Sequence, residues 1–147
     1  MKKYTVFKYL AFAFLLTFAI NAHAQTDSTW TQNQLMQPAV LANMLKTNAA
    51  SVTIISVGPF SDIPGSIHVG MVKDADNLAK FKTQLSKMNK NKKIVVYCGC
   101  CPFDHCPDIR PAMQTLKEMK FTNYYLLDLR HNLKVNWIDP GYPVVKE

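Results

Sequence analysis

Outside nine consecutive residues, the sequence contains no cysteine. All four cysteines of the 147-residue chain, Cys98, Cys100, Cys101 and Cys106, lie within that one short segment. Disulfides stabilise a fold by joining segments that are distant in the chain, and thiols in a single loop cannot do so. The distribution therefore excludes a disulfide framework and indicates that the segment carries chemistry.

The sequence also lacks an apolar run long enough to span a bilayer. The longest candidate, residues 9–20, follows a basic head with three lysines and precedes Asn21-Ala22-His23-Ala24. This pattern is typical of a secretory signal peptide, residues 1–24, cleaved after Ala24. No cysteine follows the cleavage site to take a lipid. We expect a periplasmic or secreted protein without a stable membrane anchor, with one domain over residues 25–147.

Acidic residues are few, ten against seventeen lysines and arginines. Three of the basic residues and none of the acidic ones lie in residues 1–24, so residues 25–147 carry a net charge of +4. The lysine run over residues 87–93 has no interleaved aromatic residues that could stack on bases, and we expect no nucleic-acid partner. A weak attraction for small anions is compatible with this charge.

Hydrophobic patterning predicts alternating strands and helices. The strands are expected over residues 52–57, 67–69, 94–97 and 123–129, and the helices over residues 38–45 and 74–88 and from about residue 110. Such alternation predicts an α/β fold of three layers, a central mostly parallel sheet with helices on both faces. Reactive loops of these sheets lie beyond the carboxyl ends of the strands, which is where the cysteine segment falls.

Cys98 is the first residue after the strand predicted over residues 94–97, and its loop leads into a helix. Backbone amides at a helix N-terminus stabilise an anion, so we expect Cys98 to be a reactive thiolate. Arg110 can add a cation for the thiolate or an incoming anion. His105 can tune the pKa of a neighbouring thiol.

Three segments in this order resemble a single-domain rhodanese, a sulfurtransferase. They are Asp62-Ile63-Pro64-Gly65-Ser66-Ile67, then the strand, Cys98, loop and helix, and finally Gly141-Tyr142-Pro143-Val144, preceded by Trp137. The resemblance covers about residues 34–145, which it identifies as a rhodanese-like domain with an extended, cysteine-rich active-site loop.

The resemblance implies that Cys98 takes a sulfane sulfur from a small sulfur-containing anion such as thiosulfate. Cys98 would hold the sulfur as a persulfide and pass it to a thiol acceptor or a redox partner protein. No metal and no organic cofactor would be required. The loop residues expected around the substrate are Gly99, Cys100, Cys101, His105, Cys106 and Arg110.

The chain also departs from the rhodanese pattern. Ser56 and Gly58 stand where these proteins usually carry an aspartate and an arginine, and the active-site loop is longer than the common form. The Cys-x5-Arg pattern of phosphatases built on this fold is missing, because position 104 is an aspartate. The sulfur donor therefore does not follow from the resemblance.

Two other functions remain open for the loop. Cys98-x-x-Cys101 is a redox pattern, and Cys100 or Cys101 could attack a persulfide on Cys98, release sulfide and leave a disulfide. Alternatively, copper(I) or zinc could bind among soft ligands. The candidate ligands are Cys98, Cys100, Cys101, His105 and Cys106. A Cys101–Cys106 disulfide that stiffens the loop is a third possibility, and it is compatible with a reactive Cys98.

Overall fold

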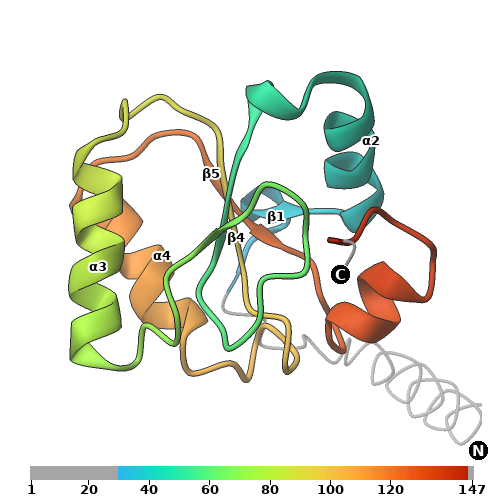
Figure 1. Cartoon of the computed structure of the whole chain (residues 1–147). Helices are drawn as coiled ribbons and strands as arrows, with labels where there is room; N and C mark the ends of the chain where they lie inside the picture. Colours follow the sequence, from blue (N-terminus) through green and yellow to red (C-terminus); the bar gives the residue numbers. More distant parts are fainter. Residues whose placement is uncertain (1–29, 146–147) are drawn as a thin grey trace, which may run out of the picture.

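The protein is described by a computed structural model that covers residues 30–145. Its centre is a five-stranded sheet in the order β1-β5-β4-β2-β3, and every pair of neighbouring strands is parallel (Figure 1). The strands are β1 (Leu35–Met36), β2 (Thr53–Ser56), β3 (Ile67–His68), β4 (Ile94–Tyr97) and β5 (Tyr124–Leu127). The predicted α/β architecture with a parallel sheet is confirmed.

Helices cover both faces of this sheet, which confirms the three layers. Helices α3 and α4 lie together on one face, while α2 and a short π-helix, η3, lie on the other (Figure 1). The helices are α2 (Pro38–Asn48), α3 (Ala75–Ser86), α4 (Ile109–Glu118) and η3 (Lys134–Ile138), with single 3-10 turns η1 (Gln32–Gln34) and η2 (Ala49–Ser51).

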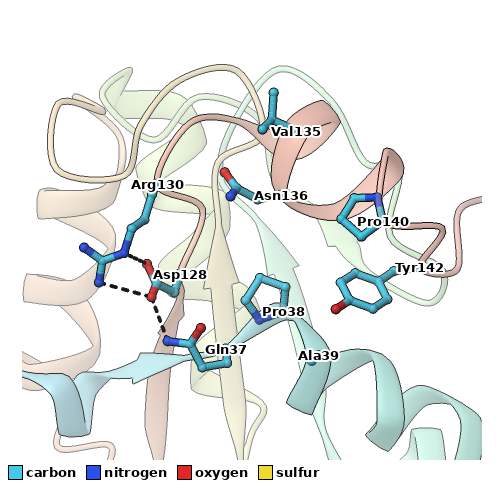
Figure 2. A pocket seen from close by; sticks show the side chains of 9 residues that line it. All are labelled: Gln37, Pro38, Ala39, Asp128, Arg130, Val135, Asn136, Pro140 and Tyr142. Carbon is cyan, nitrogen blue, oxygen red and sulfur yellow. Dashed lines mark hydrogen bonds and ion pairs between the residues drawn. The ribbon is translucent and has the colours of Figure 1, made fainter.

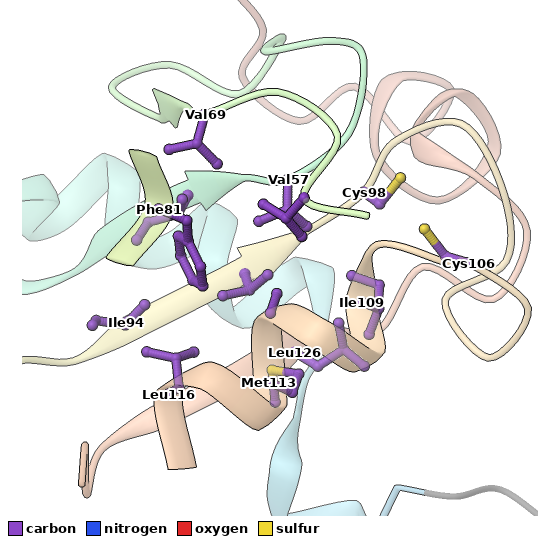
Figure 3. Packing of buried hydrophobic residues seen from close by; sticks show 14 of the residues in the cluster. Val57, Val69, Phe81, Ile94, Cys98, Cys106, Ile109, Met113, Leu116 and Leu126 are labelled. Atoms are coloured by element: carbon purple, nitrogen blue, oxygen red, sulfur yellow. The ribbon is translucent and has the colours of Figure 1, made fainter. Parts of the chain in front are cut away.

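The two faces of the sheet form two separate cores, because successive side chains of a strand point in opposite directions. From β2, Ile55 packs toward α3 and α4, while Ile54 packs toward α2. Figure 3 shows the first core, in which Phe81 of α3 and Leu116 of α4 cover the sheet. Burying one such side chain contributes about 1.5–3 kcal/mol. The cores therefore hold the ends of the central strands in fixed positions.

Several boundaries differ from the prediction. Strand β1 was not predicted, since two apolar residues carry no periodic signal, yet they pair with Leu126 and Leu127 of β5. Strand β5 ends at Leu127 rather than at residue 129 because the Leu129 N–H turns back to the Leu127 carbonyl. The π-helix η3 lies in the segment after β5, for which no helix was predicted.

The predicted signal peptide, residues 1–24, lies outside the described residues. Over residues 30–145, none of the helices has the length and apolar character that crossing a bilayer requires.

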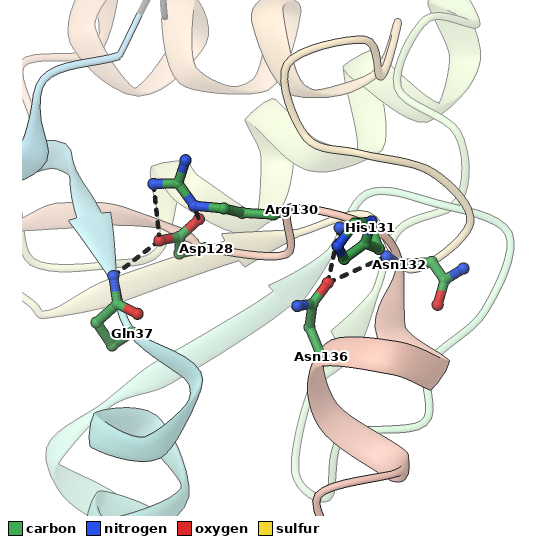
Figure 4. A network of polar contacts seen from close by, with 6 residues as sticks. All are labelled: Gln37, Asp128, Arg130, His131, Asn132 and Asn136. Atoms are coloured by element: carbon green, nitrogen blue, oxygen red, sulfur yellow. Dashed lines mark hydrogen bonds and ion pairs between the residues drawn. The ribbon is translucent and has the colours of Figure 1, made fainter.

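A buried carboxylate joins the ends of β1 and β5. Asp128 is 4% exposed, and its Oδ2 accepts a hydrogen bond of 2.7 Å from the Gln37 amide (Figure 4). The Arg130 Nε lies 3.1 Å from the Asp128 Oδ1. These residues also line a pocket of about 270 Å³ that Tyr142 and Pro140 close on its far side (Figure 2). Gln37 and Arg130 thus compensate the desolvation of this carboxylate.

Replacing Gln37 with alanine is expected to lower the free energy of unfolding by about 1–2 kcal/mol, because the variant removes one donor from a buried charge. Urea unfolding measures this change. The matched control is Gln114→Ala, whose amide pairs with Glu118 on the exposed face of α4 and should cost only about 0.2–0.5 kcal/mol. Equal losses in the two variants would contradict the role assigned to Gln37.

Candidate functional site

Cys98 directly follows β4, the strand that pairs with β2 on one side and β5 on the other. A backbone hydrogen bond of 2.9 Å from the Val57 N–H to the Tyr97 carbonyl holds the chain just before Cys98. The Cys98 side chain is only 1% exposed. The thiol therefore sits at the end of the central sheet on a rigid support.

Gly58, at the end of β2, provides the space for the Cys98 sulfur. A Cβ atom at position 58 would lie 2.7 Å from the Cys98 Sγ and 3.3 Å from its Cα. The first of these distances is shorter than any normal contact, so a side chain here would displace the thiol. The glycine is required for close approach rather than for an unusual backbone angle.

Backbone bonds to the segment after β5 hold the cysteine loop. The Gly99 carbonyl accepts a bond of 2.9 Å from the Leu133 N–H, and the Phe103 N–H donates one of 3.2 Å to the Leu129 carbonyl. The Phe103 side chain is buried, and the Arg130 guanidinium lies 6.0 Å from its ring centroid. Since all four cysteines are free thiols, the loop owes its shape to these contacts and not to a disulfide.

The four thiols form a continuous cluster that runs from the core to the surface. The Cys98 Sγ lies 3.4 Å from the Cys100 Sγ, which is in turn 3.3 Å from the Cys101 Sγ. On the buried side, the Cys98 and Cys106 sulfurs and an Asp108 carboxylate oxygen lie within 4.8 Å of one another. Cys98 and Cys106 are buried at the rim of the first core, whereas Cys100 is exposed (Figure 3).

The interaction between Cys98 and Cys106 favours the negative charge of this cluster on Cys106. A hydrogen bond from the Cys98 thiol lowers the pKa of Cys106 to about 6, and the backbone amides of Asp108 and Ile109 contribute to the lowering. The bond donated to Cys106, together with burial, raises the pKa of Cys98 well above its ordinary value. Burial is also the main cause that raises the pKa of Cys101 to about 12. We expected the helix amides to serve Cys98, but they reach Cys106.

The other loop residues proposed from the sequence lie nearer the surface. His105 is exposed, and its Nδ1 lies 2.9 Å from a carboxylate oxygen of Asp104, which is also exposed. Arg110, the second residue of α4, lines a groove of about 480 Å³ together with Trp30 and Lys117. The pKa of Cys98 is shifted by the hydrogen bond with Cys106, by burial and by Cys100.

The protein-family comparison decides the relationship of the chain. Residues 37–129 match the model of the Rhodanese-like domain, and this match includes β2, β4 and the whole cysteine loop. The chain belongs to the rhodanese-like family. No curated protein sequence matches it at a significant level.

Solved structures agree with the rhodanese-like fold. The Alr3790 protein from Anabaena sp. is 19% identical with a TM-score of 0.57, and the match covers 75% of this chain and 90% of that one. A protein from Lactobacillus plantarum is 17% identical with a TM-score of 0.58, covering 78% and 89%. The single-domain sulfurtransferase RDL2 of Saccharomyces cerevisiae is 12% identical with a TM-score of 0.52, covering 76% and 95%.

Sequence reasoning missed two residues of the rhodanese-like site. Asp108 is buried at the N-cap position of α4, and its side chain makes no capping bond but accepts a hydrogen bond of 2.9 Å from the Lys73 N–H. An aspartate just before a helical pattern is a recognisable capping signal. In the sequence, Gly58 was noted only as a departure from the rhodanese pattern. Because parallel strands end at one edge of the sheet, its position after β2 could have indicated a contact with Cys98.

The lowered pKa of Cys106 predicts a pH-dependent stability. Between about pH 6 and pH 9 the folded chain holds the Cys106 thiolate while the unfolded chain binds the proton, so this contribution grows as pH rises and is lost as pH falls through about 6. Between pH 6 and pH 9, the free energy of unfolding of the wild type should rise by about 1 kcal/mol or more relative to that of Cys106→Ser. Urea unfolding of both proteins at several pH values measures the difference. A difference that does not change with pH would contradict a Cys106 thiolate.

Proposed function

We propose that this rhodanese-like protein is a sulfurtransferase that carries sulfane sulfur as a persulfide on Cys98. The observation that carries the proposal is the thiol cluster itself. A free thiol stands at the end of the central strand, Gly58 leaves the space that its sulfur occupies, and Cys106 lies beside it. Membership of the family and the sulfurtransferase RDL2 among the related folds support this choice of chemistry.

The first step is nucleophilic attack by Cys98. Cys98 and Cys106 share one proton between their two sulfurs, and the reactive form is the one in which the proton lies on Cys106 and Cys98 is the thiolate. Its sulfur attacks the outer sulfur of thiosulfate, the S–S bond of the donor breaks, and sulfite leaves with the bonding electron pair. In the second step an acceptor thiolate attacks the outer sulfur of the persulfide, and Cys98 leaves as the thiolate. The chain is neither oxidised nor reduced overall.

The burial of Cys98 selects its reaction partners. With 1% of the residue exposed, the Cys98 sulfur can meet a donor only when the cysteine loop moves aside, and a small anion needs a smaller opening than a folded protein does. Thiosulfate or another small sulfur-containing anion meets this requirement. The acceptor in this proposal is a thiol, supplied by a small molecule or by a redox partner protein. We place the reaction in the periplasm or outside the cell, in a protein without a membrane anchor or nucleic-acid partner, on the strength of the signal-peptide pattern of residues 1–24.

A second candidate, persulfide reduction, is favoured by the distance of 3.4 Å between the Cys98 and Cys100 sulfurs. Here the Cys100 thiolate attacks the inner sulfur of the Cys98 persulfide. Hydrosulfide leaves, and a Cys98–Cys100 disulfide remains. A dithiol redox partner must then reduce that disulfide before another cycle.

Mass analysis of the reduced protein after treatment with thiosulfate tests the two candidates. The sulfurtransferase proposal expects one added sulfur atom that maps to Cys98 in peptides of the loop. An added sulfur on a different cysteine would overturn the assignment of Cys98. Release of sulfide with a Cys98–Cys100 disulfide, together with reduction of insulin disulfides, would instead establish the second candidate.

A further inference from the structure

Three thiols of the loop lie close together on the surface side of the cluster. The Sγ atoms of Cys98, Cys100 and Cys101 all lie within 4.8 Å of one another, with 3.4 Å for the first pair and 3.3 Å for the second. Sulfur transfer through Cys98 needs one nucleophile, and persulfide reduction needs one more. Neither reaction uses three converging thiols.

The spacing of these sulfurs fits a trigonal metal site. A metal–thiolate bond of about 2.3 Å places the sulfurs of a planar three-coordinate site about 4 Å apart. The three thiols reach this spacing if their side chains separate by a few tenths of an ångström, which requires only small rotations. Cys100 is exposed and Cys101 half-buried, so both side chains have room to adjust.

The number and type of ligands indicate which metal binds. Thiolates are soft ligands that select copper(I) and zinc. A structural zinc site requires four ligands in a tetrahedron, with sulfurs about 3.8 Å apart. The Cys106 sulfur does not lie within 4.8 Å of all three sulfurs of Cys98, Cys100 and Cys101. Three thiolates without a fourth therefore favour copper(I) over zinc.

The alternative ligand set on the buried side is less suited to a soft ion. Cys98, Cys106 and Asp108 also lie within 4.8 Å of one another, but all three are buried. The Asp108 carboxylate is a hard ligand, and its Oδ1 already accepts the Lys73 N–H. The exposed Cys100, in contrast, gives an ion a path from solvent.

We propose that Cys98, Cys100 and Cys101 form a three-coordinate binding site for copper(I). The site goes beyond sulfur transfer and does not depend on it, since it requires the three sulfurs as ligands and no persulfide. Cys98 belongs to both the copper(I) site and the sulfur-transfer site. Copper(I) and a sulfur donor therefore compete for the Cys98 sulfur.

Anaerobic titration of the reduced protein with copper(I), in competition with a chromogenic copper(I) chelator, tests the site. We expect one copper(I) per chain and three sulfur neighbours in the X-ray absorption spectrum. Removing a residue that only orients a metal ligand typically costs about 10- to 100-fold in affinity, so Cys100→Ser and Cys101→Ser should each weaken binding by about 100-fold or more. These side chains are not buried, so we expect both variants to fold.

The matched control is Cys106→Ser, which removes the fourth thiol of the same loop and should still bind one copper(I) per chain with three sulfur neighbours. An equal loss in Cys106→Ser and Cys100→Ser would overturn the proposed ligand set. Tighter binding of zinc with four sulfur neighbours, or no stoichiometric copper(I) binding, would overturn the site. The titration contains no sulfur donor, so its failure is distinguishable from a failure of sulfur transfer.

Discussion

Replacing Cys98 with serine should lower the rate of sulfur transfer from thiosulfate to a thiol by about three orders of magnitude or more. A serine hydroxyl stays protonated near neutral pH and attacks sulfur poorly, so no persulfide forms. The measurement is kcat/KM for thiosulfate in steady state. Circular dichroism should show an unchanged fold, because the smaller hydroxyl fits the space that Gly58 leaves.

Cys106→Ser is the matched control for this variant. It keeps the nucleophile and removes the sulfur that shares a proton with Cys98, so we expect transfer to slow by about 10- to 100-fold, near the lower limit for loss of an acid–base group. Persulfide loading on Cys98 should persist. Should Cys98→Ser retain transfer while Cys106→Ser loses it completely, the nucleophile would be Cys106.

Gly58→Ala should have the second largest effect on transfer. The new Cβ would lie 2.7 Å from the Cys98 Sγ, so the sulfur must move by a distance comparable to the misplacements of about 1 Å that cost enzymes roughly 100-fold. Overpacking should also lower the free energy of unfolding by about 1–3 kcal/mol. Measurements of kcat/KM and of urea unfolding separate the two effects.

Gly65→Ala is the control for the effect of adding a methyl group. Gly65 has a φ of +73° and no atom within 4 Å of its missing Cβ, so alanine there strains the backbone without touching the thiol. We expect a stability loss of about 1 kcal/mol and an unchanged transfer rate. Full activity in Gly58→Ala would show that the Cys98 sulfur does not need the space beside this glycine.

Sequence patterns located those elements of the fold that carry strong local signals. The apolar run of β4, residues 94–97, has the predicted bounds, and α3 falls within the predicted range 74–88, with Phe81 and Leu85 buried four residues apart on one face. The two-residue strand β1 could not be predicted because only its pairing with β5 defines it. Pairing between distant segments leaves no periodic pattern in either of them.

The site was predictable in its position and less so in its electrostatics. A cysteine at the end of a central strand follows from the order of strand, loop and helix. The preference of the helix amides for Cys106 over Cys98 depends on how the loop folds back on α4, because the Asp108 and Ile109 amides reach the Cys106 sulfur. No spacing rule for the loop contains that information.

The contacts of Gly99 and Phe103 with the chain after β5 have a consequence for the redox behaviour of the loop. A loop fastened by peptide groups does not need a disulfide to hold its backbone. We therefore expect oxidation or persulfidation to move the sulfur atoms more than the backbone of the loop. Surroundings that switch between oxidising and reducing would tune the reactivity of this protein without unfolding it.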